Sequence, residues 1–542
     1  MPESTARLSG IYSFLARLLW GKDLRESSFL LSRWLFLRLL GLIHLIAFAS
    51  YWSQMEGLVG SHGISPAVEF LESLKRVLGD RCYSVAPTIC WLGASDGILH
   101  VLCGVGVMLS VLLVGGVAPV PVLFVLWWLY LSLVVVGQQF FNFQWDVLLL
   151  ETTFLALFLA PLAWLPDLRK ERSPSKLALG LQFALLFKLM FLSGVTKLLS
   201  GDSTWLRLTA LPIHYETQPL PTVLGWYTFH LPDWFHRFSV LGMFVIEIPV
   251  AFLIFAPRRL RHLGALSLML FQLLIALTGN YTFFNLLTVV LCVLLFDDLF
   301  LLQLVPGRWR GRVEPPARSP PALSRPWWLR TAIAAPMVLI LMVSTYTLLA
   351  EVSRTYRNAL GRQPPPEFSW PVGATLEMVG RLVDTVEDEN RGGLAGFRHV
   401  RTINGYGLFR SMTVLRPELI FEGSRDGVEW KEYEFRWKPV ALDRAPGFVA
   451  PHQPRLDWQM WFAALNVPGN LPWLQRLAQH LLRGTPEVLA LLGENPFPDA
   501  PPSHVRLVYY KYRFTSLEVK RETGAWWTRE KLGVVARFSP RR

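Results

Sequence analysis

Two lysines in an apolar segment are the residues of this sequence whose position most clearly indicates a functional role. Lys197 lies at helical spacing from Ser193, Thr196 and Ser200, so the four form one polar stripe on an otherwise apolar helix. Lys188 lies nine residues earlier, on a different face. A charge at mid-depth in a bilayer costs at least about 2.5–3.5 kcal/mol unless it is paired or hydrated, which makes each lysine a functional candidate. A lysine near a helix end can instead extend its ammonium group to the lipid headgroups.

A partner for the deeper lysine lies in the next apolar run. Lys188 and Glu247 both fall near the middle of their runs, which one loop connects. We therefore expect them to form an intramembrane ion pair, which serves either function or the register of the two helices.

Composition predicts a polytopic membrane protein. Of 542 residues, 52% are hydrophobic and 17% charged, and the mean hydropathy is +0.35. The net charge of +13 comes mostly from short basic clusters between apolar runs. This placement indicates membrane topology, with lipids as partners, and argues against nucleic-acid binding.

The apolar runs predict about nine transmembrane helices. They cover residues 34–53, 97–117, 119–137, 147–166, 176–200, 238–257, 260–278, 281–303 and 327–350. Basic residues concentrate before the first run and in the loops after the fourth, sixth and eighth, all on one side. Because cytoplasmic loops accumulate Lys and Arg, we expect a cytoplasmic N-terminus and an exoplasmic chain beyond residue 350.

This topology gathers polar residues at the exoplasmic ends of the spans, where they form either a ligand site or ordinary polar loop ends. The candidate cluster consists of Gln54, Glu56, His62, Asp146, Glu151, Lys197, Trp205, His214, Glu216, Asn280 and Asn285.

The composition changes after residue 350, and three regions follow. Residues 1–350 form the transmembrane domain, 351–370 a Pro-rich linker, and 371–542 an exoplasmic β-rich, β-sandwich-like domain. Strand patterns cover about 400–437 and 505–516, with a helical insertion between them. Cys82 and Cys90 share one loop and can pair in an oxidising compartment.

The familiar catalytic motifs are absent from the sequence. There is no nucleophile elbow, zinc-binding H-E-x-x-H, phosphate loop or C-x-x-C. The histidines are scattered, so we expect neither a metal nor a cofactor.

Several long blocks resemble the lipase maturation factor family, in the family's order. Among them are YWSQMEGLVGSHGISP, LTALPIHYETQPLPT, INGYGLFRSMT and PHQPRLDWQMWFAAL. The resemblance implies a non-enzymatic protein of the endoplasmic-reticulum membrane whose lumenal domain helps dimeric secreted lipases reach their active, assembled form. Arg-rich, Lys-poor usage suggests a bacterial source, which would place the protein in the inner membrane.

For such a folding factor we expect the exported domain to bind partly folded clients. The candidate contact residues are Trp430, His452, Arg455 and Asp457, which either face the client or fill the core of the domain. The sequence does not fix the oligomeric state.

A shorter block resembles another class of protein. Residues Gly194 to Leu198, with Trp205 beyond, look like the segment around the lysine base of vitamin K-dependent γ-carboxylases. That resemblance implies a membrane enzyme with Lys197 as general base. A lysine paired with Asp146 or Glu151 explains the same residues.

Overall fold

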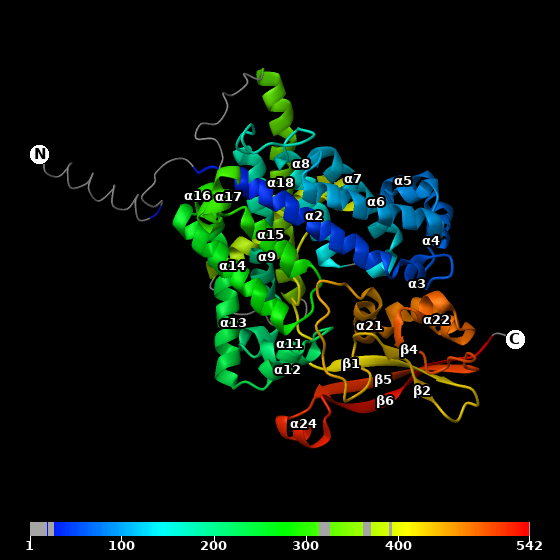
Figure 1. Cartoon of the computed structure of the whole chain (residues 1–542). Helices are drawn as coiled ribbons and strands as arrows, with labels where there is room; N and C mark the ends of the chain where they lie inside the picture. Colours follow the sequence, from blue (N-terminus) through cyan, green and yellow to red (C-terminus); the bar gives the residue numbers. More distant parts are fainter. Residues whose placement is uncertain are drawn as a thin grey trace, which may run out of the picture.

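The chain folds into a helical bundle and a smaller sheet domain that packs against one end of it (Figure 1). The computed structural model describes residues 19, 27–313 except 142, 326–360, 370–389 and 393–540. Buried apolar side chains form one continuous core that includes residues of both parts. The two parts are therefore packed as one unit rather than joined only by a tether.

Seven helical segments within the described ranges are long and apolar enough to cross a membrane, and an eighth is a pair broken by a 113° bend. The helices that form them are α2 (Leu30–Trp52), α6 (Asp96–Gly115), α7 (Pro119–Val136), α9 (Lys176–Leu199), α13 (Asp233–Glu247) with η4 (Val250–Phe255), α14 (Arg258–Thr278), the pair α15 (Phe284–Val293) and α16 (Asp298–Leu304), and α18 (Trp327–Leu360).

The expected count of nine is not confirmed, because two of the predicted spans have a different form. The run at 147–166 overlaps α8 (Gln144–Leu159), which has only 16 residues and is shorter than the roughly 20 that cross a bilayer. The run at 281–303 is the bent pair of α15 and α16. Hydropathy alone detects neither a short helix nor a sharp bend.

Small residues allow α2 and α6 to pack closely, as is common between membrane helices. A Cβ added at Gly106 would overlap the ring of Phe48, and one at Gly41 would lie 2.9 Å from the backbone nitrogen of Val114. Asp298 then fixes the first turn of α2 by accepting from the backbone NH groups of Leu30 and Leu31, at 3.0 and 2.8 Å. These acceptors satisfy donors that a helix start leaves without partners.

Short helices occupy the loops between the spans. They are α3 (Met55–Val59), α4 (Ala67–Leu78), α5 (Cys82–Val85), α10 (Ser203–Leu206), α11 (Ala210–Thr217), α12 (Val223–Phe229) and α17 (Gly307–Val313). Cys82 and Cys90 are both buried and unbonded, so the possible disulfide does not form.

The C-terminal sheet has four antiparallel strands in the order β2-β1-β5-β6. The strands are β1 (Arg416–Ser424), β2 (Lys431–Glu432), β5 (His504–Phe514) and β6 (Trp527–Phe538), and a separate pair consists of β3 (Glu434–Phe435) and β4 (Leu492–Glu494).

Helices cover the face of this sheet that points toward the bundle. α21 (Arg455–Leu465) and α22 (Val467–Arg483) lie between the sheet and the membrane helices (Figure 1), while α23 (Pro486–Leu489) and α24 (Leu517–Thr523) are short. The helical insertion is confirmed. The sandwich-like arrangement is wrong, because helices rather than a second large sheet complete this core.

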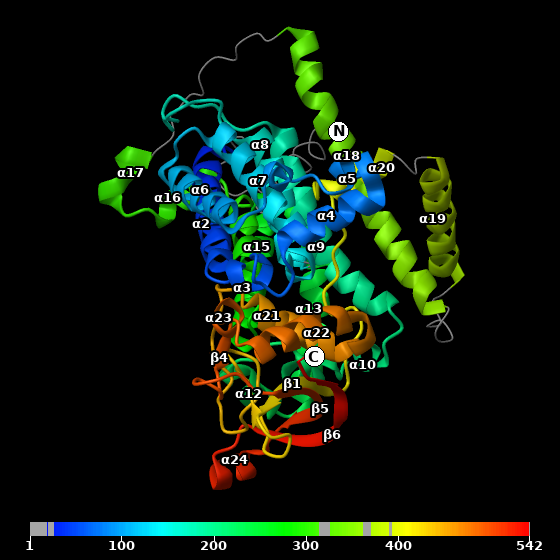
Figure 2. The same cartoon turned by 90° about the vertical axis from the view of Figure 1, so that its right-hand side faces the viewer.

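The predicted linker and the start of the β domain also need correction. α18 continues to Leu360, and residues 361–369 lie outside the described part. The next elements are helices, α19 (Trp370–Glu389) beside α18 and then α20 (Gly393–His399) (Figure 2). Residues 400–415, predicted as strand, have no regular structure.

The close contact of α2 with α6 gives a first prediction. Gly106→Ala should lower the free energy of unfolding by about 1–3 kcal/mol, because the added methyl overpacks against Phe48. Gly97→Ala is the matched control on the same helix, since a Cβ there meets nothing within 4 Å. Thermal unfolding of the purified proteins in detergent measures both. Equal stability of the two variants would refute the packing argument.

Candidate functional site

The polar residues at the ends of the membrane helices hold the C-terminal domain in place, and a buried ion pair is at the centre of this contact. Arg455, the first residue of α21, donates from Nη2 to Oδ1 of Asp146 at 2.9 Å and from Nη1 to Oδ2 at 3.1 Å. The same Nη1 donates to the carbonyl of Phe140 at 2.6 Å. The hydroxyl of Tyr130 donates to Asp146 at 2.5 Å. Both charged side chains are fully buried, so pairing offsets the cost of removing them from water.

The end of α2 and the residues just after it bind the residues around the start of α21. The amide of Gln54 donates to the carbonyl of Gln453 at 2.8 Å and accepts from the backbone NH of Arg455 at 2.9 Å. The hydroxyl of Ser50 lies 2.9 Å from Nδ1 of His452. Buried polar groups on both sides are thereby satisfied across the domain boundary.

Asn280 and Glu216 make a similar contact from other loops. The amide oxygen of Asn280 accepts from the backbone NH groups of Val449 and Ala450, at 2.8 and 3.1 Å, and its NH₂ donates to the carbonyl of Gly447 at 2.8 Å. The carboxylate of Glu216 accepts from the NH of Phe514 at 2.9 Å. Asn280 begins a glycosylation sequon, but its amide is buried and engaged in these bonds.

An irregular segment, residues 402–412, enters the bundle from the C-terminal domain and binds Glu151. Oε2 of Glu151 accepts from the backbone NH of Asn404 at 3.0 Å and from the hydroxyl of Tyr406 at 2.8 Å. The NH of Gly407 donates to the side chain of Gln144 at 3.3 Å. Non-helical backbone inside a membrane protein needs such partners, because lipid offers none.

The two lysines each have a buried carboxylate partner, but not the predicted one. Lys188 donates to Glu151 at 2.6 Å, and Lys197 donates to both oxygens of Glu247 at 2.9 and 2.8 Å. The expected Lys188–Glu247 pair is therefore wrong. That pair was predicted only from the similar depth of Lys188 and Glu247 in their apolar runs. In the structure Glu247 is the last residue of α13 and lies beside Lys197. Trp205 adds a cation–π contact, 5.5 Å from the ammonium of Lys197.

His214 belongs to a hydrogen-bond chain with two buried neighbours. Its Nε2 lies 2.9 Å from the hydroxyl of Tyr281, which donates to Gln218 at 2.8 Å. Desolvation lowers the pKa of His214 to about 3. The imidazole is therefore neutral near pH 7 and serves as a hydrogen-bonding group.

Other members of the predicted cluster pair within the membrane part of the chain or lie at the surface. Glu56 is exposed and pairs with His100 at 2.6 Å, and His62 is also exposed. Asn285 donates to Gln272 at 2.9 Å, inside the bundle.

The expected client contacts must also be corrected. Arg455 and Asp457 are buried, and Asp457 accepts from the backbone NH groups of Trp437 and Lys438 at 2.9 and 2.8 Å. His452 faces Ser50 of α2. Trp430 is partly exposed, with the guanidinium of Arg506 stacked 4.0 Å from its ring.

Three residues outside the predicted sites, Asn404, Tyr406 and Arg416, also take part in the contact between the two domains. Arg416 is buried, pairs with Glu418 at 2.8 Å and donates to the carbonyls of Glu216 and Pro219, at 2.8 and 3.0 Å. The INGYG stretch is the sequence feature that could have predicted the irregular segment 402–412. Its glycines are unusual in a strand and typical of irregular backbone.

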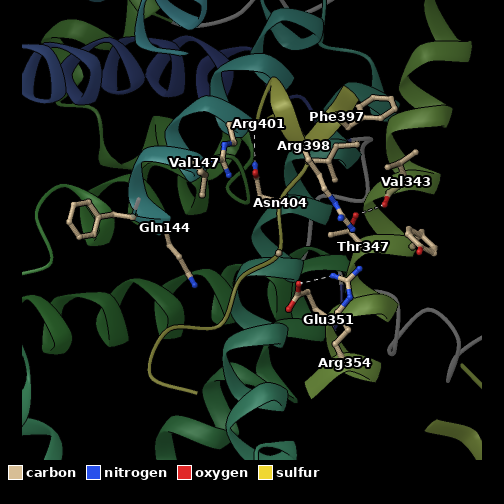
Figure 3. Close-up of a pocket in the computed structure, with 14 residues that line it drawn as sticks. Gln144, Val147, Val343, Thr347, Glu351, Arg354, Phe397, Arg398, Arg401 and Asn404 are labelled. Carbon is tan, nitrogen blue, oxygen red and sulfur yellow. Dashed lines mark hydrogen bonds and ion pairs between the residues drawn. The ribbon is translucent and has the colours of Figure 1, made fainter. Parts of the chain in front are cut away.

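A cavity of about 400 Å³ lies where α8, α18 and the residues after α20 meet (Figure 3). Within the described ranges, no three His, Cys, Asp or Glu side chains come together as a metal site.

Comparison with known proteins gives a consistent result for both parts of the chain. Residues 31–303 match the lipase maturation factor transmembrane domain, and residues 402–537 match the lipase maturation factor C-terminal domain. Lipase maturation factor 2 of Gallus gallus is 37% identical over 590 residues, covering 92% of this chain and 80% of that protein. Lipase maturation factor 1 of Homo sapiens is 34% identical over 537 residues, covering 95% and 89%. No solved structure matches the chain.

The buried pair at the domain boundary gives the second prediction. Arg455→Met leaves Asp146 charged and without its partner, so it should lower the free energy of unfolding by about 3–5 kcal/mol. The double variant Arg455→Met/Asp146→Leu should recover most of this loss, because no unpaired charge stays buried. Thermal unfolding in detergent measures both proteins.

A second ion pair across the same boundary provides the control. Arg476 of α22 lies 3.9 Å from Glu69 of α4, and both side chains are largely exposed. Arg476→Met should cost less than about 1 kcal/mol. A loss as large as that of Arg455→Met would mean that burial does not determine the effect.

Proposed function

The chain belongs to the lipase maturation factor family, and we propose that it assists the folding and assembly of secreted client proteins, lipases among them. It is a multi-pass integral membrane protein. The observation that carries the proposal is that the family match extends over both the membrane domain and the C-terminal domain, in order and over most of the chain. The buried Arg455–Asp146 pair supports the view that the two domains act as one unit.

We further propose that the C-terminal domain lies outside the cytoplasm, in the endoplasmic-reticulum lumen of a eukaryote or the periplasm of a bacterium. The end of the bundle opposite this domain carries the basic loops. Arg33 pairs there with Glu171, Arg258 with Asp297, and Arg169 donates to the carbonyl of Gly311 at 2.6 Å. Basic loops of this kind favour the cytoplasmic side.

The client surface in this proposal is the tip of the β1–β2 hairpin, which points away from the membrane helices. Val428 is 79% exposed at this tip. Trp430 follows it, half-buried against Arg506. An exposed aliphatic group beside an aromatic ring provides an apolar contact for a partly folded chain.

Site-specific photocrosslinking tests the client surface and the orientation together. A photoreactive residue at Val428 should crosslink to a newly made secreted lipase when the full chain and the lipase are expressed in the same cells. The same residue at Trp164 is the control, because Trp164 is also 79% exposed but lies in the loop with the basic residues. Crosslinks from position 164 and none from 428 would contradict both proposals.

We propose no catalytic step for the protein, since its named relatives are maturation factors. Lys197, the candidate base of the carboxylase reading, donates to both oxygens of Glu247. A general base needs an unprotonated amine, whereas this geometry suits an ammonium held in an ion pair.

Substitution of Lys197 separates the two readings. Lys197→Arg should keep lipase maturation close to the parent level, because arginine preserves the charge and the pairing. Lys197→Met should destabilise the protein by about 3–5 kcal/mol by leaving Glu247 buried and unpaired. Adding Glu247→Gln should restore most of that stability. Maturation is measured as secreted lipase activity, and stability by thermal unfolding.

The decisive outcome concerns the arginine variant. Arginine stays protonated and cannot act as a base near neutral pH. If Lys197→Arg is inserted and stable but inactive, the maturation-factor reading of Lys197 is wrong and the enzyme reading gains support.

A further inference from the structure

Three large apolar side chains are exposed in the loop between α8 and α9. Leu162 is 85% exposed, Trp164 79% and Leu165 75%. Their segment, residues 160–166, has no regular structure and contains no charged residue. Single exposed apolar side chains are common on protein surfaces, but several adjacent ones mark a contact with a partner or a membrane.

Hydrogen bonds and an ion pair hold this loop against the ends of membrane helices. The backbone NH of Ala118, the residue just before α7, donates to the carbonyl of Trp164 at 2.7 Å. Farther along the loop, Glu171 pairs with Arg33 in the first turn of α2. The last turn of α2 contacts the C-terminal domain through Ser50. The loop is therefore fixed at the end of the bundle opposite that domain.

The bond to Ala118 also gives the depth of the loop relative to the membrane. α6 ends at Gly115 and α7 begins at Pro119, and both helices are long and apolar enough to span a bilayer. A short turn between two consecutive spans lies at the membrane boundary. Because Trp164 is bonded to a residue of this turn, it lies at the same level.

The length of α8 explains why the residues after it are apolar. α8 begins beside the C-terminal domain, where Asp146 pairs with Arg455, and it ends at Leu159. Its 16 residues rise about 24 Å, whereas the hydrocarbon core is about 30 Å thick. Residues 160–166 therefore have to complete the crossing, and they do so without helical structure.

The backbone of this loop suits the boundary of a membrane. Irregular backbone near hydrocarbon needs hydrogen-bond partners, because lipid tails offer none. Pro161 and Pro166 have no NH group to satisfy, and the carbonyl of Trp164 already has its donor. Tryptophan is also the side chain most typical of the layer where acyl chains meet headgroups.

We propose that residues 160–166 are an interfacial anchor, which inserts Leu162, Trp164 and Leu165 into the bilayer where acyl chains meet headgroups. The bilayer is the partner of this apolar surface, because the loop is bonded to the shared end of two membrane spans. The anchor fixes the depth of α8, whose other end holds the C-terminal domain. The proposal is independent of the client function.

Fluorescence quenching of the full chain tests the anchor. A fluorescent amino acid, excited where tryptophan does not absorb, replaces Trp164 in one variant and Leu162 in another. Both variants are placed in phosphatidylcholine nanodiscs, whose two faces are open to solvent. Brominated phosphatidylcholine quenches from the lipid and iodide from the water. Both labels should lose fluorescence with brominated lipid and keep it with iodide.

Two further label positions calibrate the measurement. Val428, 79% exposed at the tip of the β1–β2 hairpin, should respond to iodide and not to brominated lipid. Leu270, 57% exposed in the middle of α14, should respond to brominated lipid and not to iodide. The two loop labels should behave like the label at position 270, although the loop is not part of a helix.

Two other results would overturn the proposal. Quenching of both loop labels by iodide alone would place the loop in water. Protection from both quenchers would mean that protein covers the loop, either a second copy of this chain or another partner. The measurement needs no client, so its outcome is separate from that of the proposed function.

Bilayer thickness provides a second readout. In nanodiscs of dilauroyl phosphatidylcholine, whose hydrocarbon core is thinner, a loop at the boundary should move into water. Iodide should then quench the label at position 164, while the label at position 270 stays protected. An unchanged response to iodide at position 164 would contradict a location at the membrane boundary.

Discussion

The contact between Asp146 and Arg455 is the constraint on which the relation of the two domains depends. Both charges are buried, and neither is tolerable there without the other. Asp146 belongs to a short helix of the bundle, and Arg455 begins the helix that supports the sheet. Their bidentate geometry fixes direction as well as distance, so the sheet domain has one position on the bundle.

Much of the architecture could be read from the sequence because hydropathy and strand patterns are local signals. The long spans, the helical insertion and β5 all lie where those patterns predict them. The sharp bend between α15 and α16 could not be read in this way, nor could the loss of strand structure at 400–415. In both places, tertiary contacts override the local preference.

In the candidate site, too, the positions of the polar residues could be predicted from local sequence patterns, but their distant partners could not. Convergence of Gln54, Asp146 and Asn280 at one end of the bundle followed from the topology. Their partners did not, because Gln453, Arg455 and Val449 are distant in sequence. The lysines illustrate this further: Lys197 clearly needed a carboxylate, but only the fold reveals that Glu247 rather than Asp146 supplies it. Two of the residues expected to face clients, His452 and Arg455, instead attach the domain to the bundle.

The entry of residues 402–412 into the bundle has a consequence for biosynthesis. Glu151 is translated 253 residues before Asn404, so the membrane helices emerge from the ribosome well before one of their own buried carboxylates is fully hydrogen-bonded. Insertion of the spans therefore precedes completion of their interior, which waits for a segment made after α18. A nascent chain that stops short of this step keeps an under-satisfied acidic group within the membrane. Cellular quality control thus has a chemical difference by which to distinguish unfinished copies from finished ones.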